Sequence, residues 1–265
     1  MKSGGWSAPR YSPGRERAWH LSVLINEAQC AWCAHDLETG EVVSLHWSEG
    51  LTALDVDAVP DHPRATSFVT LPEWSTLVPE SAMAPGTEAQ HLRLVHGGLP
   101  TGAMRSESVE SLGAVCVYLH DDELERAVLD RFPSARPVPM QSLMARGALA
   151  RSAEEPVLLI HRGHDRLDCA VADRGQLQLS TTYPARSSQD ALYYALLAAN
   201  GSGYAPADLR LLHGGTHLTQ HEQDLLQRYF TKARTALPPW NGHAAEPGTA
   251  PHRWLALLEQ FACAS

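Results

Sequence analysis

Residues 20–47 read HLSVLINEAQCAWCAHDLETGEVVSLHW, and residues 155–182 read EPVLLIHRGHDRLDCAVADRGQLQLSTT. In both stretches an apolar segment, a polar turn, a second segment, a short turn with glycine and a third segment follow one another. One offset along the chain aligns Gly40 with Gly175, and glycine supplies the positive φ that such compact turns need. Each stretch therefore predicts a three-stranded antiparallel meander.

The repeat of this meander divides the chain. Its offset is about half of the 265 residues, and a period this long indicates duplication of a domain rather than a solenoid. We expect two similar lobes, at residues 18–152 and 153–265. Residues 1–17 hold Gly, Ser, Pro and Arg without an apolar run, and they predict a flexible tail.

The second lobe continues in a regular order. A capping box, Thr219 with Glu222, starts one of its helices because each side chain can satisfy a free backbone N–H of the other. The meander is followed by a helix at 188–199, a strand at 208–212, this helix after Thr219, a strand at 232–236 and a helix at 252–261. Three strands followed by alternating helices and strands resemble a ribonuclease H-like domain, an α/β fold with mixed sheets.

The first lobe is more divergent. Asp121 and its acidic neighbours are favoured at a helix N-terminus by the helix dipole, and Pro133 ends the helix that they start. After the first meander we expect a strand at 67–71, a broken helix at 79–95, a strand at 109–119, a helix at 121–132, a strand at Val138 and a helix at 141–150. A linker at 151–155 then opens the second lobe.

Composition limits the function classes. Apolar residues make up 44% and charged residues 19%, and the net charge is −9. An acidic chain argues against a general binder of nucleic-acid phosphates. The N-terminus lacks the ~7–15 apolar residues of a signal peptide, and no stretch approaches the ~18 of a membrane span. We expect a cytoplasmic protein without a membrane span, whose five cysteines are reduced.

Two ribonuclease H-like lobes in one chain resemble the arrangement of the actin, sugar-kinase and Hsp70-type ATPases. The chain also resembles a bacterial family found mainly in Bacteroidetes, domain of unknown function 3822. The resemblance covers residues 18–236, and three stretches of sequence carry it. They are Thr76-Leu77-Val78-Pro79-Glu80, Asp190-Ala191-Leu192-Tyr193-Tyr194-Ala195-Leu196-Leu197 and Leu212-x-Gly214. The resemblance implies an actin-like ATPase fold, and this family carries no assigned activity. Pilus and secretion proteins that use the fold as a scaffold are a more distant likeness.

The chemistry of an ATPase of this fold needs an acidic residue at the end of the first strand and a glycine-rich turn whose N–H groups hold phosphate. In the first lobe Asn26 stands where Asp is wanted, and the turn has no glycine. Asn ligates a metal only through a neutral oxygen. A shift of register could bring Glu27 to this position.

In the second lobe the turn reads His161-Arg162-Gly163-His164-Asp165-Arg166. Arg162 and Arg166 could face an anion, or the segment is an ordinary solvated turn. Gly214 and Gly215 resemble the glycine pair that approaches adenosine in this superfamily, although turns between a strand and a helix often hold glycine. If nucleotide binding is retained, ATP is the expected ligand at Gly163, Arg162, Arg166, Gly214 and Gly215; otherwise we expect no cofactor.

Other chemistries lack their residues. The first strands, at 21–25 and 157–160, carry none of the carboxylates that a two-metal nuclease needs. His213, His217 and His221 are spaced by four, but the glycines and the N-cap between them prevent one helical face, so we expect no metal site. Cys30 and Cys33 point to opposite faces of a strand. We expect no catalytic residue.

The sequence favours a non-catalytic interaction or scaffold protein, a pseudo-enzyme that has lost its ATPase residues, over an enzyme. Its expected partner is an unidentified protein, and a homodimer is left open. The alternative is an ATP-binding enzyme or nucleotide-dependent switch of the same superfamily. A third and weaker hypothesis is a metal-dependent hydrolase that uses the histidines.

Overall fold

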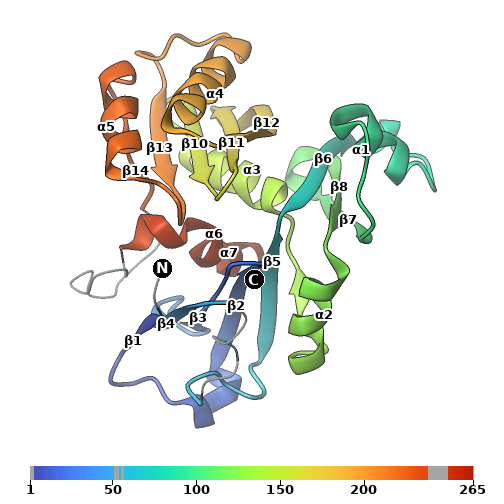
Figure 1. Ribbon diagram of the computed structural model, residues 1–265, viewed down its shortest axis with the longest axis vertical. Coiled ribbons are helices and arrows are strands. Elements are labelled where there is room, and N and C mark those ends of the chain that lie inside the picture. Colours follow the sequence, from blue (N-terminus) through green and yellow to red (C-terminus); the bar gives the residue numbers. More distant parts are fainter. Residues whose placement is uncertain (1–2, 51–53, 55–56, 238–249, 265) are drawn as a thin grey trace. The chain divides into compact units, whose positions relative to one another are not determined.

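The computed structural model describes residues 3–50, 54, 57–237 and 250–264. The chain divides into two compact units (Figure 1). Unit 1 comprises residues 1–139, 239–250 and 257–265, and unit 2 comprises residues 140–238 and 251–256.

The main sheet of unit 1 has the strand order β1-β4-β3-β2-β5-β9. Neighbours from β1 to β2 are antiparallel, whereas β2, β5 and β9 run parallel. The strands are β1 (Gly4–Ser7), β2 (Trp19–Asn26), β3 (Gln29–Asp36), β4 (Val42–Glu49), β5 (Ala65–Leu71) and β9 (Arg136–Pro137). The first predicted meander, β2-β3-β4, is confirmed, and Gly40 has the positive φ of 72° that its turn requires.

The sheet of unit 2, β12-β11-β10-β13-β14, repeats the part of this order that runs from β4 to β9. Again three antiparallel strands are followed by two parallel ones, and Gly175 has a φ of 73° in the second turn. The strands are β10 (Val157–Arg162), β11 (Arg166–Asp173), β12 (Gln176–Pro184), β13 (Arg210–Gly214) and β14 (Arg234–Thr235). The shared order confirms two ribonuclease H-like lobes.

Helices complete each unit. In unit 1, α2 (Asp122–Arg131) begins at the N-cap Asp121, whose side chain accepts from two backbone N–H groups. Unit 2 contains α3 (Met140–Arg151), α4 (Ser188–Gly201) and α5 (Gln220–Tyr229). The sequence predicts α3 in the first lobe, but this almost fully buried helix contacts β10, β11 and β12 and belongs to unit 2.

The segment expected as a flexible tail is ordered from Gly4 onward. It forms β1 and the 3-10 helix η1 (Pro13–Ala18). The glycines that suggested flexibility instead allow close packing, because a Cβ at Gly4 would lie 2.5 Å from the ring of Trp47. Trp19 Nε1 also donates to the carbonyl of Ser12 at 2.9 Å.

Unit 1 holds a second sheet that the sequence did not predict. Its order is β6-β8-β7, with strands β6 (Glu73–Pro79), β7 (Ala103–Val109) and β8 (Ala114–His120), the 3-10 turns η3 (Glu80–Ala82) and η4 (Glu110–Leu112), and the helix α1 (Glu88–His96). The expected helix at 79–95 is therefore shorter and begins later. The expected strand at 109–119 is broken at Gly113, whose φ of 55° ends η4.

The last predicted helix, at 252–261, is not continuous. It is divided into η5 (Pro251–Trp254), α6 (Leu255–Leu258) and α7 (Gln260–Ala264). Residues 251–256 belong to unit 2, whereas the residues from 257 onward belong to unit 1, where α7 contacts β2 and β5.

Candidate functional site

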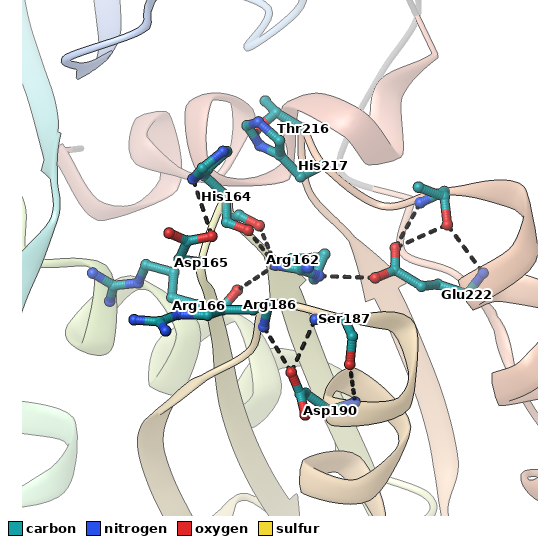
Figure 2. Close-up of polar contacts among 12 residues, drawn as sticks. Arg162, His164, Asp165, Arg166, Arg186, Ser187, Asp190, Thr216, His217 and Glu222 are labelled. Carbon is teal, nitrogen blue, oxygen red and sulfur yellow. Dashed lines mark hydrogen bonds and ion pairs between the residues drawn. The ribbon is translucent and has the colours of Figure 1, made fainter.

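The turn between β10 and β11 in unit 2 is the best-defined polar site of the candidate residues (Figure 2). Arg162 is the last residue of β10 and Arg166 the first of β11. The N–H of Gly163 donates to the carbonyl of Arg166 at 3.0 Å, which closes the turn. The predicted residues Arg162, Gly163 and Arg166 therefore lie together, as expected for this hairpin.

Arg162 is buried and its guanidinium points back into the turn. Nη1 donates to the carbonyl oxygens of Gly163 at 2.5 Å and of His164 at 2.7 Å. Nε donates to Oε1 of Glu222 at 3.0 Å. Charge-assisted bonds of this kind are the stronger ones in proteins, so the guanidinium is held by the turn that carries it.

Glu222 has two functions at the start of α5. Its Oε2 accepts from the backbone N–H of Thr219 at 2.8 Å, and Thr219 Oγ1 accepts from the N–H of Glu222 at 3.1 Å. The predicted capping box is thus confirmed. The other carboxylate oxygen neutralises Arg162. The capping pattern identified Glu222 in the sequence, but not its partner 60 residues away.

Arg166 forms an ion pair with Asp168, which lies two residues further along β11. Thr182 Oγ1 donates to Oδ1 of Asp168 at 2.8 Å. Burial acts to raise the pKa of Asp168, but the charge of Arg166 and the interaction with His161 outweigh it and hold that pKa far below its ordinary value. Asp168 is ionised and its charge is balanced within the unit.

The glycine pair after β13 fits closely against its neighbours. A Cβ at Gly215, whose φ is 118°, would lie 2.4 Å from the carbonyl oxygen of Arg162. A Cβ at Gly214 would lie 2.5 Å from the carbonyl oxygen of His252, which accepts from the N–H of Gly215 at 2.8 Å. Both positions require glycine for packing within unit 2.

The edge of the site carries more exposed polar residues. His164 and His217 meet edge to face, with ring centroids 5.1 Å apart. Burial, with the charge of His164 next in size, lowers the pKa of His217 to about 4. Asp190 accepts from the backbone N–H groups of Arg186 and Ser187, each at 2.9 Å, and completes the capping box of α4 (Figure 2).

The corresponding turn of unit 1 lies between β2 and β3. Oδ1 of Asn26 accepts from the backbone N–H of Ala28 at 2.9 Å. The β2–β3 register pairs Ile25 with Cys30, which leaves Glu27 exposed in the turn. Asn26 therefore lies at the end of the strand, and the register shift that would bring Glu27 to this position does not occur. The side-chain oxygen of Asn26 closes the turn.

Histidine and cysteine side chains are the candidate metal ligands of the chain. Among the residues that the structure describes, no group of three or more His, Cys, Asp or Glu side chains is placed to hold a metal ion. Cys33 is buried, and its Sγ lies 3.2 Å from Nε2 of His35. Burial raises the pKa of the Cys33 thiol well above its ordinary value, which favours the neutral thiol.

Two units whose sheets share a three-stranded meander followed by two parallel strands define the actin-like ATPase fold. The chain is similar to a Bacteroides thetaiotaomicron protein with an actin-like ATPase fold and unknown function, with a TM-score of 0.78 and 13% identity, over 96% of this chain and 99% of that chain. It is also similar to the PilM-PilN type IV pilus biogenesis complex, with a TM-score of 0.53 and 11% identity, over 94% and 98% of the chains.

The sequence matches the family model "Protein of unknown function (DUF3822)" over residues 70–232. The chain belongs to this family, as the motifs at 76–80 and 190–197 indicated. No curated protein matches it in sequence. Along the described part of the chain, no helix has the length and hydropathy to cross a membrane.

Proposed function

We propose that this protein is a non-catalytic, cytoplasmic scaffold or interaction module of the actin-like fold, in which the groups that would handle nucleotide serve internal contacts instead. The observation that carries the proposal is the position of Arg162. Its guanidinium occupies the β10–β11 turn, where this fold would present backbone N–H groups to phosphate.

The geometry of the turn disfavours an anion. A phosphate-binding turn directs N–H groups inward, whereas the carbonyls of Gly163 and His164 here point at a cation. That cation is already neutralised by Glu222. A triphosphate would have to displace Glu222 and leave a buried carboxylate without its partner, which opposes binding by several kcal/mol.

The turn of unit 1 supports the same proposal. Asn26 carries no charge at the position where an acidic residue would balance Mg²⁺. Its oxygen is engaged by the N–H of Ala28, which is one of the groups that a phosphate would otherwise recruit. Both turns are therefore closed by their own side chains.

A protein of this fold can act through a protein partner, since PilM is found in a complex with PilN. We extend this type of function to the present chain without naming its partner. The proposal requires only that the fold supplies a surface, not that it turns over a substrate.

Thermal denaturation with MgATP, MgADP and Mg²⁺ alone tests the proposal. A ligand at 100 times its Kd stabilises a protein by ~2.7 kcal/mol. We expect no change in Tm at millimolar nucleotide and no release of phosphate from ATP, in a plate where a known ATP-binding protein shows its shift. A nucleotide-specific rise in Tm would contradict the proposal and restore the alternative, an ATP-binding enzyme or switch. The variant Asn26→Asp is measured in the same way, and the comparison shows whether a carboxylate at position 26 makes the Tm depend on Mg²⁺.

A further inference from the structure

Helix α4 places its small residues inward and its large ones outward. The buried positions of the helix are all alanine: Ala191, Ala195, Ala198 and Ala199. Tyr193 is 59% and Leu197 41% exposed, and they lie four residues apart on one face. From Ala191 to Ala199 the sequence contains no charged side chain. The solvent face of α4 is therefore apolar over more than two turns.

Aromatic residues extend this face onto β12. The ring of Tyr194 stacks on that of Tyr183, with centroids 4.6 Å apart and an angle of 9° between the planes. Tyr193 meets Tyr194 edge to face at 5.1 Å. We call Tyr183, Tyr193, Tyr194 and Leu197 the α4 patch. Because its rings already hold one another in place, ordering them in a contact costs little entropy.

Asp190, at the N-terminal end of the helix, is engaged by the capping box, and two further charges of opposite sign lie at the two ends of the helix. Arg186 precedes α4 by two residues, and Asp208 lies in the loop that follows its C-terminus; both are exposed. The loop is tied to the helix end by the bond from Tyr204 N–H to the carbonyl of Ala199 at 3.1 Å. Within the described ranges, neither charged side chain has an ion-pair or hydrogen-bond partner.

We propose that the α4 patch binds a second copy of this chain, with the two α4 helices antiparallel about a twofold axis. A twofold contact brings the same patch together from both subunits. The antiparallel direction places each Arg186 against Asp208 of the partner subunit, so the charges at both ends are satisfied at once. Tyrosine is among the residues that contribute most at interfaces.

The opposite signs at the two ends favour this occupant over an unrelated helix. A patch with one sign of charge at both ends would repel its own copy, whereas this one is complementary to itself when reversed. All residues of the contact belong to unit 2. The association goes beyond the proposed scaffold function, which names no partner.

Sedimentation velocity of the full chain, from about 1 to 100 µM, tests the dimer. We expect a species of twice 28.9 kDa. Leu197→Glu should raise the dimer Kd by ~30-fold or more, and its Tm should match that of the unaltered chain at concentrations where both are monomeric. The matched control is Leu94→Glu on α1, where Leu94 is 82% exposed, and it should remain dimeric.

A charge exchange tests the antiparallel arrangement. Arg186→Glu alone should weaken the dimer by ~10-fold, because two carboxylates then face each other at each end. Arg186→Glu combined with Asp208→Arg should restore the affinity of the unaltered chain. A monomer at all concentrations, a dimer insensitive to Leu197→Glu, or a double variant as weak as the single one would each overturn the proposal. If the chain is a monomer at all concentrations, the partner of the α4 patch is a different protein.

Discussion

Ser67 and Gln260 are joined by a hydrogen bond of 2.9 Å although 193 positions separate them in the chain. The same glutamine donates from Nε2 to the carbonyl of Val23 at 2.9 Å, and Ser67 also contacts Nε2 of His20 at 3.0 Å. These buried contacts fix α7 to the main sheet of unit 1. They show why the last predicted helix is interrupted, because its final turn serves a different unit from its first.

Replacing Gln260 should loosen this attachment. Gln260→Ala leaves the Ser67 hydroxyl and the Val23 carbonyl buried without this partner, so we expect a loss of ~1–3 kcal/mol in the free energy of unfolding. Urea denaturation measures the change. Ala262→Ser, at an exposed position of the same helix, should alter it by less than ~0.5 kcal/mol. Equal effects of the two variants would contradict the assigned role of Gln260.

Acid should destabilise unit 1 through His20. Burial lowers its pKa to about 4, and burial with the charge of His20 lowers that of His35 to about 3. Below pH 6.5 the unfolded chain takes up protons that the folded chain excludes. The stability is therefore fully present above pH 6.5, and His20 should account for a loss of about 3 kcal/mol as the pH falls to 4.

Urea denaturation at a series of pH values checks this dependence. His20→Gln should reduce the loss in the free energy of unfolding between pH 6.5 and 4. The other buried histidines should account for the loss that remains. His62→Gln is the control, since His62 is exposed, and its profile should follow that of the unaltered chain. A decline that is the same in both variants would rule out His20 as its source.

The Arg162–Glu222 pair yields a double-variant prediction. Arg162→Met leaves Glu222 buried with an unpaired charge and should cost about 3–5 kcal/mol. Glu222→Gln retains a side chain that can cap α5 while removing the charge. We therefore expect Arg162→Met/Glu222→Gln to be more stable than Arg162→Met alone in urea denaturation. If the double variant is as unstable as the single one, the loss is one of packing rather than of charge.

Glycines at two positions should respond in opposite directions to the same substitution. Gly215→Ala forces a side chain into the left-handed region and against the backbone of Arg162, so we expect a loss of at least ~2 kcal/mol. Gly201→Ala meets nothing within 4 Å at the end of α4 and should stabilise by ~0.5 kcal/mol. Thermal denaturation compares the two, and a similar Tm for both variants would contradict the close packing at Gly215.

The main sheets could be predicted because their pattern is local. Each meander contains its own turn residues, so Gly40 and Gly175 marked both lobes. The sheet β6-β8-β7 could not, because β6 pairs with β8 across the intervening α1 and β7, and the short hairpin between β7 and β8 contains the 3-10 turn η4. Pro79 was interpreted as the start of a helix, although it ends β6. The break at Gly113 was not recognised, so residues 109–119 were predicted as one long strand.

The candidate site was predictable in its members but not in its contacts. From the sequence, Arg162 and Arg166 could face an anion or belong to an ordinary solvated turn. The structure pairs them with Glu222 and Asp168. The pairing of Arg162 depends on tertiary packing, and local spacing carries no information about a partner 60 positions away. Nucleotide binding at these residues stays a prediction that the Tm measurement decides.

The mutual dependence of Arg162 and Glu222 bears on how this chain can evolve. Either replacement alone strands a charge in the interior, so a lineage that acquired the pair cannot discard it one mutation at a time without passing through an unstable intermediate. A descendant that bound phosphate at this turn would have to change the helix cap and the hairpin together.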